Sequence, residues 1–171
     1  MDYIFEKVDH SSALQIVAWD YPAPYDLYNL HHSEVARDRL VSGPYFASFS
    51  GSDLVGFVCF GKAARLSGKK DNPLYAASEF LDIGLGMHPA WCGKGYGEGF
   101  VRAGLLFAQN RGWNEGFRLT VAANNIRARK VYTRLGFREI GQIPWDSSSA
   151  WDFLVMTLDT PAPGSRGSTA G

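Results

Sequence analysis

Apolar residues recur along the chain with two different spacings, which predict strands and helices. Tyr3–Val8 combines aromatic and β-branched residues in alternation, as a half-buried strand does. Residues 97–111 instead repeat their apolar positions at helical spacing. By the same criteria we expect further strands at 44–50, 54–60, 79–87, 117–122, 137–141 and 153–158, and further helices at 13–18, 32–40 and 126–135. This order indicates an α/β or α+β domain whose sheet is mostly antiparallel at its start.

Local signals mark where several of these elements begin and end. Asp9–Ser12 offers an N-cap for the first helix, and Gly136 offers a C-terminal cap for the last one. Gly51–Asp53 predicts a short turn between the two strands of a hairpin. In the second helix, the spacing predicts that Val35 and Leu40 point toward the core.

Three segments lie outside this regular pattern. Trp19–Leu30 is dense in aromatic residues and carries two prolines, so we expect it to be ordered but irregular. Trp145 and Trp151 lie in a loop between the last two strands. The end of the chain is small, polar and rich in proline and glycine, which is typical of a mobile tail. The predicted organisation is one domain at 1–159 and a flexible tail at 160–171.

The composition is that of a globular protein, with 46% hydrophobic and 20% charged residues in a chain of 171. The sequence has no apolar run of roughly 18 residues and no basic-then-apolar leader, so we expect no membrane partner and no signal peptide. Cys59 and Cys92 lie far apart, which indicates reduced thiols and a cytoplasmic location. No cysteine cluster indicates zinc, and we expect no metal.

The formal net charge of zero conceals two opposed halves. Residues 1–60 carry eight acidic and three basic side chains, whereas residues 61–171 carry nine acidic and fourteen basic ones. Six basic residues lie from Arg118 to Arg138, a segment without an acid. The segment also lacks exposed stacking aromatics between its bases, so we expect no nucleic-acid partner. It fits either a local anion site or a solvated helix face.

Glycine recurs at alternate positions between the fourth predicted strand and the helix that follows it, at Gly93, Gly95, Gly97 and Gly99. Glycine lets the backbone approach a ligand closely, and a helix start offers unpaired N–H groups with a partial positive charge. The arrangement is typical of a pyrophosphate site.

Three other interpretations of this turn differ in the residues that they require. A P-loop is excluded because Lys94 is followed by glycine and not by serine or threonine. A Rossmann loop is disfavoured because the next strand ends without an acid. A glycine turn without a ligand stays open.

Two blocks of residues, one on each side of the fifth predicted strand, decide between these interpretations. The first block is Cys92-Gly93-Lys94-Gly95-Tyr96-Gly97, preceded by Met87-x-Pro89. The second block is Asn125-x-x-Ala128-x-x-x-Tyr132-x-x-x-Gly136-Phe137. Together they resemble the acetyl-CoA loop and the following helix of the GNAT N-acetyltransferase superfamily. Cys92 departs from the usual Gln or Arg, so we expect backbone N–H groups and Lys94 to hold the phosphates.

This resemblance implies a GNAT fold, with a mixed, mostly antiparallel sheet of six to seven strands flanked by helices. Two central parallel strands, at 79–87 and 117–122, are implied to splay apart and admit acetyl-CoA as a co-substrate. The implied contacts are Gly86, Met87 and Asn125 for the pantetheine arm, and Cys92, Gly93, Lys94, Gly95, Tyr96 and Gly97 for the pyrophosphate. From their charge we expect Arg129 and Lys130 to meet the 3′-phosphate or adenine end.

The implied chemistry is direct attack of a primary amine on the thioester, with both substrates bound together. Tyr132 matches the family tyrosine that protonates the CoA sulfur. An ammonium must first lose a proton to a base or a water relay. Glu79 acting through water, Asp82 and His88 stay open as candidates for that base.

The acceptor side is expected in the aromatic-rich first segment, where Asp20 and Asp26 stand beside Tyr25 and Tyr28. Acidic and aromatic groups together suit an amine, although the same residues also suit simple packing. We therefore expect a small-molecule or peptide amine as acceptor, bound by a monomer or a homodimer. The alternative function, from another class, is a non-catalytic CoA-binding sensor or interaction module on the same fold.

Overall fold

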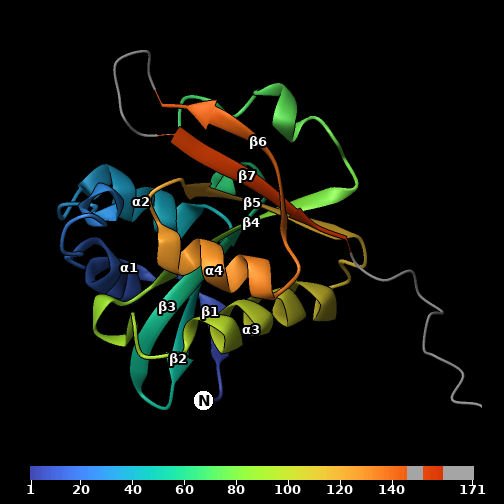
Figure 1. Cartoon of the computed structure of the whole chain (residues 1–171). Helices are drawn as coiled ribbons and strands as arrows, with labels where there is room; N and C mark the ends of the chain where they lie inside the picture. The colour runs from blue at the N-terminus through green and yellow to red at the C-terminus, as the bar shows by residue number, and fades with distance from the viewer. Residues whose placement is uncertain (146–151, 160–171) are drawn as a thin grey trace, which may run out of the picture.

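The computed structural model describes residues 1–145 and 152–159, which form one mixed sheet with helices on both faces (Figure 1). The strands are β1 (Ile4–Lys7), β2 (Tyr45–Ser50), β3 (Asp53–Phe60), β4 (Phe80–Met87), β5 (Gly116–Ala122), β6 (Arg138–Pro144) and β7 (Asp152–Leu158). The helices are α1 (His10–Val17), α2 (Glu34–Ser42), α3 (Gly97–Asn110) and α4 (Ile126–Arg134). Short 3-10 turns are η1 (Asp26–Tyr28), η2 (Gly61–Ala64), η3 (Pro73–Tyr75) and η4 (Pro89–Trp91).

The strand order is β1-β2-β3-β4-β5-β7-β6, and the pairing is antiparallel except between β4 and β5. A parallel pair needs a crossover connection, which α3 supplies. This arrangement confirms the predicted mixed, mostly antiparallel sheet and the order of its elements.

The two faces of the sheet bury different helices, because successive side chains of a strand point to opposite faces. On β2, Tyr45 and Ala47 belong to the hydrophobic core that also contains the buried residues of α1 and α2. Phe46, between them, packs its ring 5.0 Å from that of Phe107 on α3. Figure 1 shows α3 and α4 side by side over one face, with α1 and α2 beside each other away from them.

Helix ends follow the predicted caps. The Asp9 carboxylate accepts from the Ser12 N–H at 2.8 Å, and the Ser12 hydroxyl accepts from the Asp9 N–H at 3.0 Å, so α1 begins with a capping box. Gly136 has a φ of 95° directly after the end of α4, a conformation that favours glycine. These observations confirm the predicted cap of α1 and the predicted end of α4, although α1 begins at His10, three residues before the predicted start at 13.

The expected orientation of Val35 is wrong. Its side chain is 75% exposed, whereas Ala36 and Leu40 of the same helix are buried. Ala36 and Leu40 stand four residues apart and therefore share one face of α2, and Val35 lies about 100° around the helix from Ala36. The prediction for Leu40 is confirmed, but the second buried residue of α2 is Ala36 and not Val35.

Some expectations fall outside the described residues, namely those for Trp151 and for the tail at 160–171. Among the helices of 1–145 and 152–159, none has both the length and the apolar character that a membrane crossing requires.

The parallel ladder between β4 and β5 ends at a buried ion pair. Only three residue pairs form it, and Asp82 opposite Arg118 is the last of them. Both Asp82 oxygens accept from Arg118, at 2.6 and 2.8 Å, and one also accepts from Arg65 Nε at 2.8 Å. Arg118 is fully buried, and its other N–H groups donate to the carbonyls of Leu74, Tyr75 and Ala77. Charges that are buried in this way must be paired and hydrogen-bonded.

Tyr75 joins this network to β5 beyond the last strand pair. Its ring centroid lies 5.2 Å from the guanidinium carbon of Arg65 and 5.4 Å from that of Arg118. Its hydroxyl is hydrogen-bonded to Thr120 Oγ1 at 2.7 Å and accepts from the Leu66 N–H. The loop before β4 is therefore fixed to the same point as the two strands.

Replacing Arg118 with methionine should destabilise the protein by about 3 kcal/mol or more, because it leaves a buried carboxylate with an incomplete set of partners. Chemical denaturation measures the free energy of unfolding. Arg138→Met is the control, since its pair with Asp159 is 74% and 63% exposed and should contribute less than about 1 kcal/mol. Equal losses in the two variants would contradict the structural weight given to Arg118.

Candidate functional site

Beyond the Asp82–Arg118 pair, β4 and β5 continue without pairing with each other in the described chain. The continuing parts are Ile83–Met87 and Leu119–Ala122. The sheet is thus closed at one end of this strand pair and open at the other. This arrangement agrees with the expectation of a splayed parallel pair.

Backbone groups of both strands face the open end. Along a strand, the N–H and C=O of one residue point to the same side, and this side alternates from residue to residue. The His88 N–H donates to β3 and the Ala123 N–H donates to β7. The polar groups of the preceding residues, Met87 and Ala122, therefore point toward the space between β4 and β5.

The glycine-rich loop lies next to this open end and leads into α3. Gly93 and Gly95 have φ values of 73° and 86°, so both turn the chain through the left-handed region that glycine favours. A Cβ on Gly95 would meet nothing within 4 Å, and a Cβ on Gly97 would lie 3.2 Å from Val131 of α4. An exposed backbone at the start of a 14-residue helix fits a diphosphate group.

The side chains of the loop are arranged around its two aromatic residues. Trp91 and Tyr96 pack edge to face with ring centroids 5.5 Å apart, and the Tyr96 carbonyl accepts from the Tyr3 hydroxyl. Lys94 is exposed, with its ammonium 6.0 Å from the Trp91 ring. Lys94 is therefore accessible to an anion at the loop.

Cys92, at the start of the loop, turns back toward β4. Its thiol lies 3.5 Å from the Met87 carbonyl oxygen, and burial raises the pKa of the thiol. The neighbouring guanidinium of Arg127 partly offsets that rise in pKa. At neutral pH this position carries a neutral thiol, where the family motif has an amide or a cation.

Two tyrosines of the segment at 19–30 contact the open ends of both strands. The Tyr21 hydroxyl donates to the Met87 carbonyl at 2.8 Å. The Tyr28 oxygen accepts from Asn125 Nδ2 at 3.2 Å and from the Ala122 N–H at 3.4 Å. The two rings meet edge to face at 6.3 Å. This segment thus spans from the end of β4 to the end of β5.

Tyr132 is buried on the face of α4 that packs on the sheet, with its ring 5.8 Å from that of Phe137. Burial raises the pKa of the Tyr132 phenol, and the nearby Tyr28 phenol raises it further. The Tyr132 hydroxyl therefore keeps its proton at neutral pH and has a proton to donate.

The three candidate bases have different surroundings. Asp82 is buried at 3% exposure and engages two arginines. Glu79 is exposed just before β4, eight residues from Met87, which corresponds to about 26 Å of strand. His88 Nδ1 accepts the Ala90 N–H at 3.0 Å, so a neutral ring carries its proton on Nε2, and burial lowers the pKa of this histidine.

The acidic residues of the first segment are exposed, and an aromatic residue of the same segment contacts a basic residue of α4. Asp20 accepts from Asn29 Nδ2 at 3.1 Å, and Asp26 begins η1. The Tyr25 ring lies under Arg127, with the guanidinium carbon 4.0 Å from the ring centroid. The segment at 19–30 and α4 therefore contact each other through Tyr25 and Arg127.

The two basic residues expected at the cofactor have separate positions on α4. Arg129 is partly buried, and its Nη1 donates to the Ala123 carbonyl at 2.7 Å. Lys130 is exposed. Arg129 is thus held against the end of β5, whereas Lys130 extends into solvent.

Sequence reasoning missed Tyr21 and Arg127 as members of this region. Tyr21 was visible as part of an aromatic-rich segment, and Arg127 as part of the basic run. The pair of Asp82 and Arg118 left a clearer signal, because each is a charged residue in an otherwise apolar strand. Their pairing required knowledge of the strand register.

No group of three or more His, Cys, Asp or Glu side chains in the described chain is placed to hold a metal ion.

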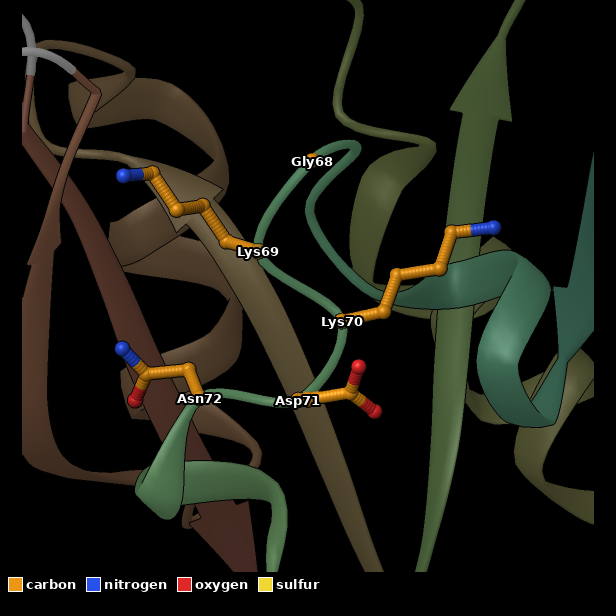
Figure 2. A pocket seen from close by; sticks show the side chains of 5 residues that line it. All are labelled: Gly68, Lys69, Lys70, Asp71 and Asn72. Atoms are coloured by element: carbon orange, nitrogen blue, oxygen red, sulfur yellow. The ribbon is translucent and has the colours of Figure 1, made fainter.

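One hollow of the described residues lies away from this site. A hollow at 68–72 lies in the loop before β4, and Figure 2 shows the side chains of Lys69 and Lys70 pointing away from each other. These two lysines do not converge on a common ligand.

Comparison with known proteins places the chain in a family. The model of the acetyltransferase (GNAT) family matches residues 11–137, which include both sequence blocks and the open end of β4 and β5. The chain therefore belongs to the GNAT acetyltransferase family, and its seven-stranded sheet has the GNAT fold. Among curated proteins, none matches the chain closely enough to count as a relative.

Solved structures share the fold at low sequence identity. A putative acetyltransferase from Salmonella typhimurium, yncA, solved with acetyl-CoA, is 16% identical with a TM-score of 0.61, covering 97% of this chain and 98% of that one. A chimera of the spermidine N-acetyltransferase SpeG from Vibrio cholerae and hSSAT is 15% identical, with a TM-score of 0.68 and coverages of 92% and 95%. AAC(6')-Ib with ribostamycin and coenzyme A is 12% identical, with a TM-score of 0.70 and coverages of 93% and 94%.

Gly95→Val should abolish detectable binding of acetyl-CoA, because its side chain fills the open space above the loop backbone and disfavours the positive φ. Calorimetric titration with acetyl-CoA measures the affinity. Gly68→Val is the matched control, since Gly68 also has a positive φ of 74° and open surroundings but lies in the loop before β4. Normal binding by Gly95→Val would contradict the position of the ligand at this loop.

Proposed function

We propose that this protein transfers the acetyl group of acetyl-CoA to a primary amine, with both substrates bound at once. The observation that supports this most directly is the glycine loop with positive φ at the start of α3, beside the open ends of β4 and β5. Membership of the GNAT acetyltransferase family supports the same reaction class.

The residues around the open end supply groups for each part of acetyl-CoA. The Met87 backbone and the Asn125 amide are the groups proposed for the pantetheine arm, which would displace the Tyr21 and Tyr28 hydroxyls that contact them. The loop from Cys92 to Gly97 offers N–H groups for the diphosphate, and Lys94 offers a charge. Gly86, the residue before Met87, has to be a glycine because a Cβ there would collide with the Phe57 ring.

The catalytic step needs a proton donor for the leaving sulfur. When bound, acetyl-CoA supplies the activated thioester that the amine attacks. Tyr132 is our choice as donor, because its buried phenol stays protonated and because α4 packs beside both the loop and β5. The raised pKa also makes this phenol a weaker acid, so proton transfer to the sulfur is favoured only as thiolate charge develops next to the hydroxyl.

The amine proton needs an acceptor, and the surroundings of the acids narrow the choice. We propose that Asp82 holds the two strands together and does not act as the base, since both its oxygens accept from arginines. Glu79 is exposed and at a distance along β4, so its role as a base requires intervening water. His88 is less suited, because Nδ1 already accepts a hydrogen bond from the backbone.

The acceptor is proposed to be a small-molecule or peptide amine that approaches the segment at 19–30. Asp20 and Asp26 present exposed carboxylates there, and Tyr25 and Tyr28 present aromatic rings. The chain is similar in fold to a spermidine N-acetyltransferase chimera and to AAC(6')-Ib in complex with ribostamycin. Both names point to polyamine or aminosugar chemistry as the first acceptors to test.

One observation favours a second candidate, a non-catalytic CoA-binding module. Tyr21 and Tyr28 already occupy hydrogen-bonding groups of Met87, Ala122 and Asn125 at the open end. The Met87 and Asn125 groups are also those proposed for the pantetheine arm, so CoA would have to displace these two hydroxyls. A CoA-dependent rearrangement of the segment at 19–30 is what a sensor requires.

A panel of amines separates the two candidates. Release of free thiol from acetyl-CoA should rise with at least one amine among spermidine, ribostamycin and a peptide with a free N-terminus, and calorimetry should show acetyl-CoA binding. Binding of acetyl-CoA without thiol release for a broad set of amines would favour the non-catalytic module. No binding of acetyl-CoA would contradict both candidates.

Tyr132→Phe should lower turnover by about a hundredfold and change the affinity for acetyl-CoA by less than about twofold, because it removes only the proton donor. Steady-state kinetics and calorimetric titration measure the two quantities. Tyr45→Phe is the matched control, since Tyr45 is a buried tyrosine of the other core cluster. Unchanged turnover in Tyr132→Phe would remove Tyr132 as the acid.

A further inference from the structure

The glycine loop lacks a strong side-chain partner for a phosphate at its first position. Cys92 stands there with a half-buried thiol that is aimed at the Met87 carbonyl. Burial keeps this thiol neutral, so it adds no charge to the loop. Of the residues in the loop itself, Lys94 is the one that carries a positive charge.

The guanidinium of Arg127, on α4, lies beside the start of the loop, where the neutral Cys92 provides no charge. Residues four apart on a helix share a face, and α4 presents Arg127 and Val131 in this way toward the loop. A Cβ on Gly97 would lie 3.2 Å from Val131, and a Cβ on Gly93 would lie 3.4 Å from Nη1 of Arg127. One face of α4 thus follows the loop, with the arginine at the Gly93 end.

Arg127 is exposed, and its guanidinium stacks on an aromatic ring and does not pair with a carboxylate. Tyr25 lies under the guanidinium, with 4.0 Å between the guanidinium carbon and the ring centroid. In the described residues, no acidic side chain comes within the 4.0 Å of a salt bridge to Arg127. Stacking on a ring positions the planar group and leaves its N–H donors free to bind a diphosphate oxygen.

We propose that Arg127 binds the diphosphate of acetyl-CoA, in place of the side chain that Cys92 cannot provide, and that Tyr25 holds it in position. This inference rests on the proposed function and adds a residue to its cofactor site. Arginine suits the role because its fork of N–H groups matches phosphate oxygens and its charge is permanent. The acceptor segment and the diphosphate site would then share one side-chain contact.

The test compares three acyl donors in calorimetric titrations of the full chain. Arg127→Ala should weaken binding of acetyl-CoA and of acetyl-3′-dephospho-CoA by the same factor, roughly ten- to a hundredfold, as expected for one charge-assisted hydrogen-bonded contact. It should leave the binding of acetyl-pantetheine unchanged, because that donor lacks the diphosphate. A loss that disappears with the dephospho donor would instead assign Arg127 to the 3′-phosphate and overturn the proposal.

Four further variants make the result specific. Cys92→Arg combined with Arg127→Ala should recover most of the lost affinity, because it restores a cation at the loop. Tyr25→Ala should weaken binding of both nucleotide donors less than Arg127→Ala does, and Tyr25→Phe, which keeps the ring, should restore the affinity that Tyr25→Ala loses. Arg37→Ala controls for the loss of one positive charge on another helix.

The outcomes separate this inference from the function on which it rests. If the parent chain binds acetyl-CoA and Arg127→Ala binds it equally well, the role of Arg127 is refuted and the proposed function stands. If Cys92→Arg combined with Arg127→Ala recovers no affinity, the claim that Arg127 takes the place of a side chain at position 92 is refuted. If the parent chain binds none of the donors, the proposed function and this inference fail together.

Discussion

The site depends on a buried ion pair that ends the pairing of two parallel strands. Asp82 and Arg118 face each other at the last paired position of β4 and β5, and Arg65 and three backbone carbonyls complete their hydrogen bonds. Such a group is costly to bury and is tolerated only when its partners are in place. Because the partners come from the loop before β4 as well as from both strands, the network fixes where the strands separate.

Everything that contacts the open end is held by elements on both faces of the sheet. α3 and α4 bring the glycine loop, Asn125 and Tyr132 from one face, and the segment after α1 brings Tyr21 and Tyr28 from the other. The charge asymmetry of the sequence has a spatial counterpart here, since the acidic first segment and the basic α4 meet at Tyr25 and Arg127.

The sequence was sufficient to predict the element order, the mixed sheet, the capped start of α1 and the position of the glycine loop. These features are encoded locally, in periodicity, capping residues and glycines with positive φ. The prediction for Val35 was wrong because Val35 and Ala36 are neighbouring apolar residues of α2 and only one of them can face the core. In the structure that residue is Ala36. The surroundings of Asp82 and the approach of Arg127 to Gly93 depend on strand register and on contacts between distant elements, which one sequence does not reveal.

The tyrosines at the open end have a consequence for solubility. Two adjacent strands that stop pairing expose N–H and C=O groups, and such an edge is a template on which a foreign strand can add. The Tyr21 hydroxyl and the Tyr28 oxygen take up the Met87 carbonyl and the Ala122 N–H. With these groups occupied by side chains of the same molecule, the interior edges of the sheet are less able to recruit another chain and seed aggregation.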